Sequence, residues 1–275
     1  MIRKAIIPAV SWDTQLLPVI KSIPKEMFPI IDKPCIHYVI EEAIQSGIEE
    51  IVIVIGDNCR VIEDYFKRSL ELEFSIVELG DLEKLEQVQS INLYSKKIQF
   101  VRQHEPLGIA HAISLARVFI GNEPFALLMG DELIQSEIPA IRQLIDVYEK
   151  HQFPVIAVQV EQKAGQIQPD IYFNESYTES FIGRYVLDSS IFDTFAALHK
   201  KIESKTQFND ALRLMSGSMQ LMSCMLNGQC YDISTRSGYF RAIVELFVSS
   251  STPAKVQKPA DLGMFFEPLD QPFLI

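Results

Sequence analysis

Short apolar runs alternate with amphipathic segments along the first 160 residues of the chain. Residues 5–10 and 51–55 are apolar, and the second run is β-branched throughout. Such runs are typical of parallel strands that are covered on both faces. Between them, apolar residues recur at helical spacing from Ile36 to Ile44, after Pro34 and before Gly47. Strand, helix and strand in this order predict a βαβ unit.

The same alternation continues to about residue 160. Strands are predicted at 98–101, 125–129 and 154–158, and helices at 109–119 and 141–151. Because parallel strands joined by helices form a sheet with helices on both faces, the pattern predicts an α/β fold with a mostly parallel, doubly wound sheet.

The rest of the chain is less regular. The acidic, leucine-rich segment 71–90 predicts a helical insertion on the surface, and residues 161–182 predict a shortened loop or a hairpin. Four of the last 23 residues are proline, which indicates an extended tail. Further elements are expected as a strand at 184–187, helices at 190–200 and 208–216, two short strands that end at Asp232, and a helix at 238–248.

Composition excludes several classes of protein. Of the 275 residues, 48% are hydrophobic and 22% charged, and the formal net charge of -11 argues against a nucleic-acid partner. The four cysteines form no CxxC pair and no cluster with histidine, so a zinc site is not expected. With no signal-peptide pattern and no apolar run of membrane-spanning length, we expect a soluble, cytoplasmic protein with reduced thiols.

Charged side chains follow several of the predicted strands. Ligands of an open parallel sheet bind outside the carboxyl ends of its strands, where carboxylates and cations could hold a divalent metal and a polyphosphate. An aspartate after a strand can equally be a turn residue or a helix cap. The candidates at this edge are the residues that follow these strands: Ser11, Trp12, Asp13, Thr14, Gln15, Lys21, Lys25, Asp131, Glu132, Asp232 and Arg236.

Several short blocks occur in one order along nearly the whole chain. They are Ile23-Pro24-Lys25-Glu26-Met27, Val101-Arg102-Gln103, Glu105-Pro106-Leu107-Gly108, Gly130-Asp131, Gly183-Arg184-Tyr185-Val186-Leu187 and Tyr231-Asp232. In sequence and spacing the chain resembles the bacterial UTP–glucose-1-phosphate uridylyltransferases, which are sugar-nucleotide pyrophosphorylases of the nucleotidyltransferase A type.

The resemblance implies a Rossmann-like sheet and a magnesium-dependent reaction. In active relatives, glucose-1-phosphate attacks the α-phosphorus of UTP, and pyrophosphate leaves as UDP-glucose forms. The implied partners are a uridine nucleotide or UDP-sugar, and further copies of the chain in a homo-oligomer. The implied division is a nucleotide-binding core (1–160), a reduced sugar-binding part that also completes the core (161–250), and a tail (251–275).

The resemblance also implies roles for individual residues. Lys25 matches the phosphate-binding lysine of the family, and Arg236 stands where the family has a second one. Asp131 and Asp232 match the magnesium ligands. The implied nucleotide contacts are Thr14, Glu26, Gln103 and Gly108, and the implied sugar contact is Asp210.

The first loop departs from the family pattern. Where relatives have Gly-Leu-Gly-Thr-Arg, this chain has Ser11-Trp12-Asp13-Thr14-Gln15. Glycines allow backbone N–H groups to surround a triphosphate, which Ser11 and Asp13 would resist. Asp13 also adds a negative charge, and Gln15 removes a positive one. One interpretation of Trp12 is that it packs into the space left by the nucleotide.

Two further departures concern the sugar side. The segment after Val160 has no counterpart of the Glu-Lys-Pro motif with which relatives contact the sugar phosphate. Ser234 stands where the family has a glycine, two positions after Asp232. His104 and His111 are interpreted as surface or packing residues, because in-line phosphoryl transfer needs no imidazole.

Two hypotheses remain open from the sequence. The protein is a UTP–glucose-1-phosphate uridylyltransferase that is weakly active or inactive, and uses Mg²⁺ if active. Alternatively, it is a non-catalytic paralogue that binds or regulates, and associates with an active uridylyltransferase.

Overall fold

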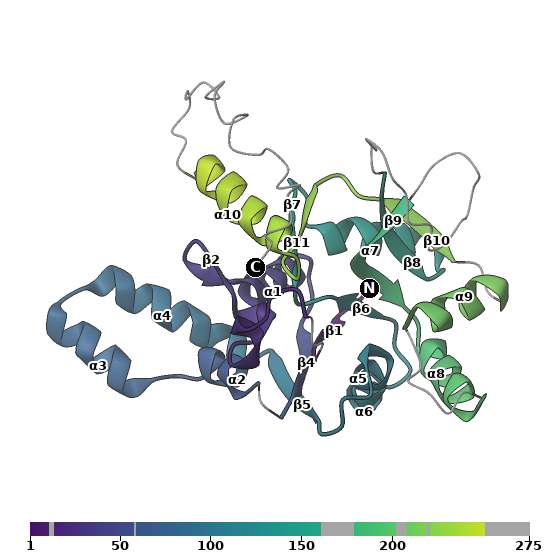
Figure 1. Ribbon diagram of the computed structural model, residues 1–275, viewed down its shortest axis with the longest axis horizontal. Helices are drawn as coiled ribbons and strands as arrows, with labels where there is room; N and C mark the ends of the chain where they lie inside the picture. The colour runs from purple at the N-terminus through teal and green to yellow at the C-terminus, as the bar shows by residue number, and fades with distance from the viewer. Residues whose placement is uncertain (11–13, 58, 161–178, 202–207, 219–220, 251–275) are drawn as a thin grey trace, which may run out of the picture.

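The computed structural model describes residues 1–10, 14–57, 59–160, 179–201, 208–218 and 221–250. Within these ranges, seven strands form one sheet with helices on both of its faces (Figure 1). In spatial order the strands are β10 (Met222–Met225), β8 (Val155–Val160), β9 (Glu179–Leu187), β6 (Phe125–Leu128), β1 (Lys4–Ala9), β4 (Glu50–Gly56) and β5 (Ile98–Gln103).

The sheet is mostly parallel, as the sequence predicts. Strand β1 lies between β4 and β6 and is parallel to both, and β4 is parallel to β5. Strand β9 is the exception, because it runs antiparallel to both β6 and β8. It is also longer than expected. Residues 179–182, predicted as part of a loop or hairpin, belong to this strand.

Side chains that alternate along the strands fill two cores. On β1, Ile7 points into one core and Ile6 into the other, and both side chains are fully buried. The first core is covered by α1 (Cys35–Gln45), α2 (Arg60–Phe66) and α7 (Ala140–His151). The second core is covered by α5 (Ile109–Leu115), α6 (Arg117–Ile120), α8 (Ser190–Lys201) and α9 (Phe208–Ser218). The helix predicted at 109–119 is therefore two helices, separated at Ala116.

A third, smaller core joins two short antiparallel ladders to the C-terminal helix. Leu133, Tyr231 and Ile233 are buried in it together with Ile30 and Ala242. The ladders are β2 (Pro29–Ile30) with β3 (Lys33–Pro34), and β7 (Glu132–Gln135) with β11 (Gln229–Asp232), and the helix is α10 (Arg236–Ser250). Strand β7 was not predicted from the sequence.

The acidic, leucine-rich insertion is a helical hairpin, as predicted. It consists of α3 (Leu70–Leu79) and α4 (Leu82–Ser95), which extend away from the sheet beyond α2 (Figure 1). The side chains of Ser69 and Asp81 cap the two helices by accepting hydrogen bonds from backbone N–H groups. No helix in the described part of the chain is both long enough and apolar enough to cross a membrane.

Some predictions fall outside the described residues. They concern Ser11, Trp12 and Asp13 of the first loop, the remainder of the predicted loop at 161–178, and the tail at 251–275. The proposed division of the chain at residues 160 and 250 stays a prediction.

Candidate functional site

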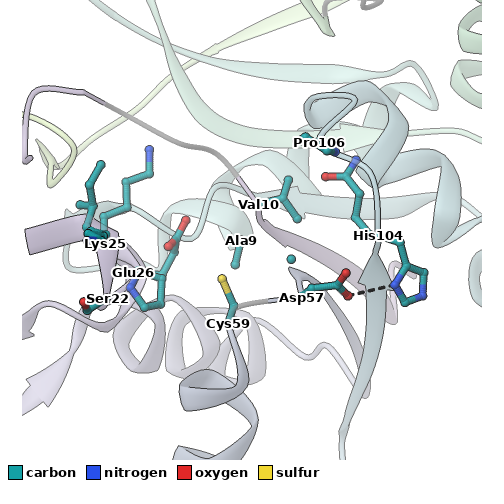
Figure 2. A pocket seen from close by; sticks show the side chains of 14 residues that line it. Ala9, Val10, Ser22, Lys25, Glu26, Asp57, Cys59, His104 and Pro106 are labelled. Carbon is teal, nitrogen blue, oxygen red and sulfur yellow. Dashed lines mark ion pairs between the residues drawn. The ribbon is translucent and has the colours of Figure 1, made fainter.

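A cavity of about 340 Å³ lies at the carboxyl ends of β1, β4 and β5. Lys25 and Glu26 lie on one wall, and Asp57 and His104 lie across the cavity from them (Figure 2). The Nδ1 atom of His104 is 2.9 Å from Oδ1 of Asp57. The cavity is therefore at the edge of the sheet where ligands of parallel α/β proteins bind.

Gln103, the last residue of β5, lines this cavity and is 4% exposed. Its Nε2 atom donates a hydrogen bond to the carbonyl oxygen of Gly108 (3.1 Å) and lies 2.7 Å from Nδ1 of His111 on α5. Gly108 precedes α5 with φ +88° and ψ −179°, a conformation that is open essentially only to glycine. The structure thus brings together Gln103 and Gly108, which were both predicted as nucleotide contacts, and adds His111, which was interpreted as a surface or packing residue.

Lys25 and Glu26 form a short 3₁₀ helix, Lys25–Met27, that follows the extended residue Pro24. Both are buried, with 5% and 2% of their surfaces exposed. Burial, and secondarily the negative charge of Asp131, raise the pKa of Glu26 to about 8. A carboxyl group with a raised pKa holds its proton more readily than an ordinary glutamate, and in that form it can donate a hydrogen bond to a carbonyl oxygen.

The two aspartates predicted as metal ligands lie on neighbouring segments. Asp131 follows β6, and Asp232 ends β11, where it pairs with Glu132 of β7. The backbone N–H of Ile233 donates to the carbonyl oxygen of Asp131 at 2.9 Å. Tertiary pairing therefore places the two residues side by side, although they are a hundred positions apart in the sequence.

The side chains of these two aspartates are carboxylates, the donor type that Mg²⁺ binds. Asp131 already contacts a cation, since Nζ of Lys25 lies 2.6 Å from its Oδ2 atom. One oxygen of Asp232 accepts hydrogen bonds from the N–H and hydroxyl of Ser234. No group of three or more acidic, histidine or cysteine residues arranged to hold a metal occurs in the described ranges. Two carboxylates suffice for Mg²⁺ when water and substrate phosphates complete its coordination.

Arg236 reaches the last residue of the first loop, Gln15. It is the first residue of α10, and its Nε atom donates to the carbonyl oxygen of Gln15 at 3.2 Å. Thr14 is exposed, and its carbonyl oxygen accepts a hydrogen bond from the N–H of Leu17. The cation of α10 and the loop after β1 are therefore neighbours, as a shared phosphate site requires.

Asp210 lies away from this group. It is on α9, where it forms an ion pair with Arg213 (3.7 Å). The neighbouring Phe208 packs against Tyr185 of β9, which is separated from β1 by β6. Asp210 is not among the residues that line the cavity, and its contact with a sugar stays a prediction.

Comparison with known proteins identifies the relatives of this chain. The profile of a family described as nucleotidyl transferase matches residues 4–167. A Bacillus subtilis protein named UTP–glucose-1-phosphate uridylyltransferase YngB is 42% identical over 266 residues, which cover 89% of each chain. The chain belongs to the nucleotidyl transferase family.

Other members of the family agree in sequence and structure. The Staphylococcus epidermidis protein named UTP–glucose-1-phosphate uridylyltransferase is 38% identical and covers 98% of this chain and 99% of its own. The structure of a UTP-bound UGPase from Acinetobacter baumannii superposes with a TM-score of 0.79 at 28% identity, covering 90% of this chain and 94% of its own. The structure of a UDP-glucose pyrophosphorylase complexed with UDP-glucose superposes with a TM-score of 0.73 at 30% identity, covering 90% of this chain and 100% of its own. The resemblance drawn from the short blocks and the predicted fold class are confirmed.

One structural feature of this family member was not foreseen from the sequence. Arg184 of β9 is fully buried and forms a two-pronged ion pair with Glu42 of α1, with Nε–Oε1 2.9 Å and Nη2–Oε2 2.8 Å. Arg184 also donates to the carbonyl oxygen of Glu132, and Glu42 accepts from the N–H of Ile141 at the start of α7. The pair thus fixes β7, and with it the neighbouring Asp131, to the main sheet.

Close packing next to this pair depends on a glycine. A Cβ atom on Gly183 would lie 2.5 Å from Met129 Cγ and 2.6 Å from Glu132 Oε1, so no larger residue fits without displacement of these neighbours. The N–H of Gly183 donates to Oε2 of Glu132 at 2.7 Å. Burial raises the pKa of Glu132 to about 7.

Proposed function

We propose that the protein is a UTP–glucose-1-phosphate uridylyltransferase of low turnover, which forms UDP-glucose from UTP and glucose-1-phosphate. The observation that carries this proposal is that Lys25, Glu26 and Gln103 line one cavity, with Asp131 paired to the lysine at 2.6 Å. The names of the relatives, at 38% and 42% identity over most of the chain, support the choice of substrates.

The reaction needs positioning and charge neutralisation rather than a covalent nucleophile. An oxygen of glucose-1-phosphate bonds to the α-phosphorus of UTP, and the bond from that phosphorus to the oxygen bridging to the β-phosphate breaks, so that pyrophosphate leaves. Gln103 and Glu26 hold the base, and Lys25 and Arg236 supply positive charge to the phosphates. When bound by Asp131 and Asp232, Mg²⁺ would neutralise charge on phosphate oxygens.

The first loop is the reason for proposing low turnover. Two glycines and an arginine of the family pattern are Ser11, Asp13 and Gln15 in this chain. Loss of a transition-state arginine in other phosphoryl-transfer enzymes lowers the rate on the order of 10³- to 10⁵-fold. Retention of Lys25, Asp131, Asp232 and a cation at Arg236 supports residual rather than abolished chemistry.

A coupled assay of pyrophosphate release tests the proposal. The purified protein is incubated with UTP, glucose-1-phosphate and Mg²⁺, and an EDTA-treated sample gives the metal-free baseline. We expect measurable UDP-glucose formation that is far slower than the roughly 10 s⁻¹ typical of enzymes. Complete absence of turnover at high enzyme concentration would contradict the proposed activity.

The second candidate is a non-catalytic paralogue that binds a uridine nucleotide or UDP-sugar and associates with an active uridylyltransferase. The first loop, which has an aspartate and no glycine, favours this second function. Such a loop disfavours binding of a triphosphate more than binding of the nucleoside. Calorimetry that detects UDP-glucose binding, together with no pyrophosphate release, would select this function. Co-purification with an active relative, and a change in that relative's rate, would identify the partner.

We also propose that the protein forms a homo-oligomer. Leu70, Phe74 and Val77 lie at spacings of four and three residues on α3 and are 53%, 68% and 53% exposed. An apolar stripe on a projecting hairpin favours contact with a second copy. Light scattering should give a multiple of the 31.3 kDa chain mass. Phe74→Asp should shift the mass towards the monomer, and a monomeric wild-type protein would contradict the proposal.

A further inference from the structure

The side-chain amide of Gln103 has a fixed orientation in the cavity wall. An amide nitrogen carries two hydrogens, and both neighbours of Nε2 are acceptors: the carbonyl oxygen of Gly108 and Nδ1 of His111. The reversed amide would place its oxygen against the Gly108 carbonyl oxygen, where two acceptors would repel each other. The amide oxygen is therefore the polar atom of Gln103 that remains for the cavity.

The same contact fixes the state of His111. Because Nε2 of Gln103 can only donate, Nδ1 of His111 must accept, at a distance of 2.7 Å. A neutral imidazole that accepts on Nδ1 carries its proton on Nε2. His111 is in the first half of α5, directly after the turn at Gly108, so one short segment supplies both acceptors that hold the amide.

We infer that His111 is a positioning residue that acts through Gln103: by holding the amide nitrogen, it keeps the amide oxygen turned toward the base. This inference rests on the proposed nucleotide binding. Uracil and thymine present an N–H at ring position 3, which the Gln103 oxygen can accept. Cytosine presents a lone pair at the same position, which would face the oxygen of Gln103 without a hydrogen bond. Discrimination of this kind is strong because a mismatch leaves a buried polar group unpaired.

Substitutions of His111 separate an acceptor role from a packing role. His111→Phe keeps a ring but removes the acceptor, so the Gln103 amide loses one of its two restraints. His111→Asn keeps an acceptor, because the asparagine oxygen can occupy the position of Nδ1. His151→Phe, at the exposed end of α7, is the matched control for a histidine-to-phenylalanine change.

The experiment is calorimetric titration of the full-length protein with UDP and with CDP. We expect wild type, His111→Asn and His151→Phe to prefer UDP strongly, and His111→Phe to lose about tenfold in UDP affinity with a smaller UDP/CDP ratio. A net hydrogen bond of about 1.4 kcal/mol corresponds to this factor. Unchanged UDP affinity and UDP/CDP ratio in His111→Phe would overturn the inference and leave the proposed function intact. UDP binding without turnover would remove the proposed catalysis but not the inference, whereas a wild-type protein that binds neither nucleotide would overturn both.

A second measurement needs no substitution. Nitrogen-15 correlation spectra of the histidine rings report which ring nitrogen carries the proton. We expect His111 in the native protein to be protonated on Nε2 and unprotonated on Nδ1 near neutral pH. A proton on Nδ1 would contradict the orientation of Gln103 and overturn the inference, even if His111→Phe fails to fold.

Discussion

The Nζ atom of Lys25 lies 2.6 Å from Oδ2 of Asp131, and the two side chains are only 6% and 17% exposed. The residue predicted to bind phosphate and the residue predicted to bind metal therefore neutralise each other in this structure. Either charge would be costly to keep away from water without the other. This contact therefore links the stability of the folded protein to the candidate site.

Removal of the lysine should destabilise the protein as well as impair the site. Lys25→Gln leaves Asp131 without its cation in a partly buried position, and we expect a loss of about 3 kcal/mol in the free energy of unfolding, measured with urea. Pyrophosphate release should fall by at least about 100-fold, because a positive charge at the phosphates is lost. Lys84→Gln removes a 70% exposed partner of Asp81 and should lower the free energy of unfolding far less, because solvent screens that pair. Equal effects of the two substitutions would contradict the burial of the Lys25 pair.

The Arg184–Glu42 pair should behave as a coupled unit. Arg184→Leu and Glu42→Leu each leave an unpaired buried charge, and each should lower the free energy of unfolding by about 3 to 5 kcal/mol. The double variant should lose clearly less than the sum, because neither charge remains. A double-mutant cycle by chemical denaturation measures this coupling. If the losses of the two single variants simply added up in the double variant, the two side chains would not depend on each other.

Glu26 should make stability depend on pH. Its folded-state pKa of about 8 lies above the ordinary value of 4.5, mainly because of burial, so the folded state holds the proton more tightly than the unfolded state. The stabilisation is complete below pH 4.5 and is lost as the pH rises through 8. Glu26→Gln should therefore gain stability relative to wild type between pH 5 and pH 8.5, measured by thermal unfolding. A stability difference between Glu26→Gln and wild type that stays constant over this pH range would refute the prediction.

Local patterns of apolar and polar residues predicted most of the helices and strands correctly. The β-branched run 51–55 is β4, and the acidic, leucine-rich segment is the α3–α4 hairpin. Strand β7 escaped prediction because it has four residues and pairs with β11, almost a hundred residues later. Helix α5 ends earlier than predicted. The prediction was too long because the apolar spacing on which it rests continues through Ala116, where the helix is already interrupted.

Short motifs point to several residues that lie at the cavity, whereas contacts between distant segments could not be predicted from the sequence. Lys25, Glu26, Gln103 and Gly108 stand in conspicuous blocks of sequence, and the structure gathers them around or beside the cavity. Arg184 pairs with a residue 142 positions away, which no local pattern reveals. His111 is only eight residues from Gln103, but its role depends on how a glutamine amide is turned, and that follows from coordinates alone.

Restoration of the first loop tests the central claim most directly. The triple variant Ser11→Gly, Asp13→Gly, Gln15→Arg recreates the family's glycines and arginine, while the residues that line the cavity stay as they are. Pyrophosphate release from UTP and glucose-1-phosphate should rise at least about 100-fold over wild type, because backbone N–H groups and a guanidinium again meet the phosphates. Wild-type turnover already on the order of 10 s⁻¹, with no gain in the triple variant, would contradict the account.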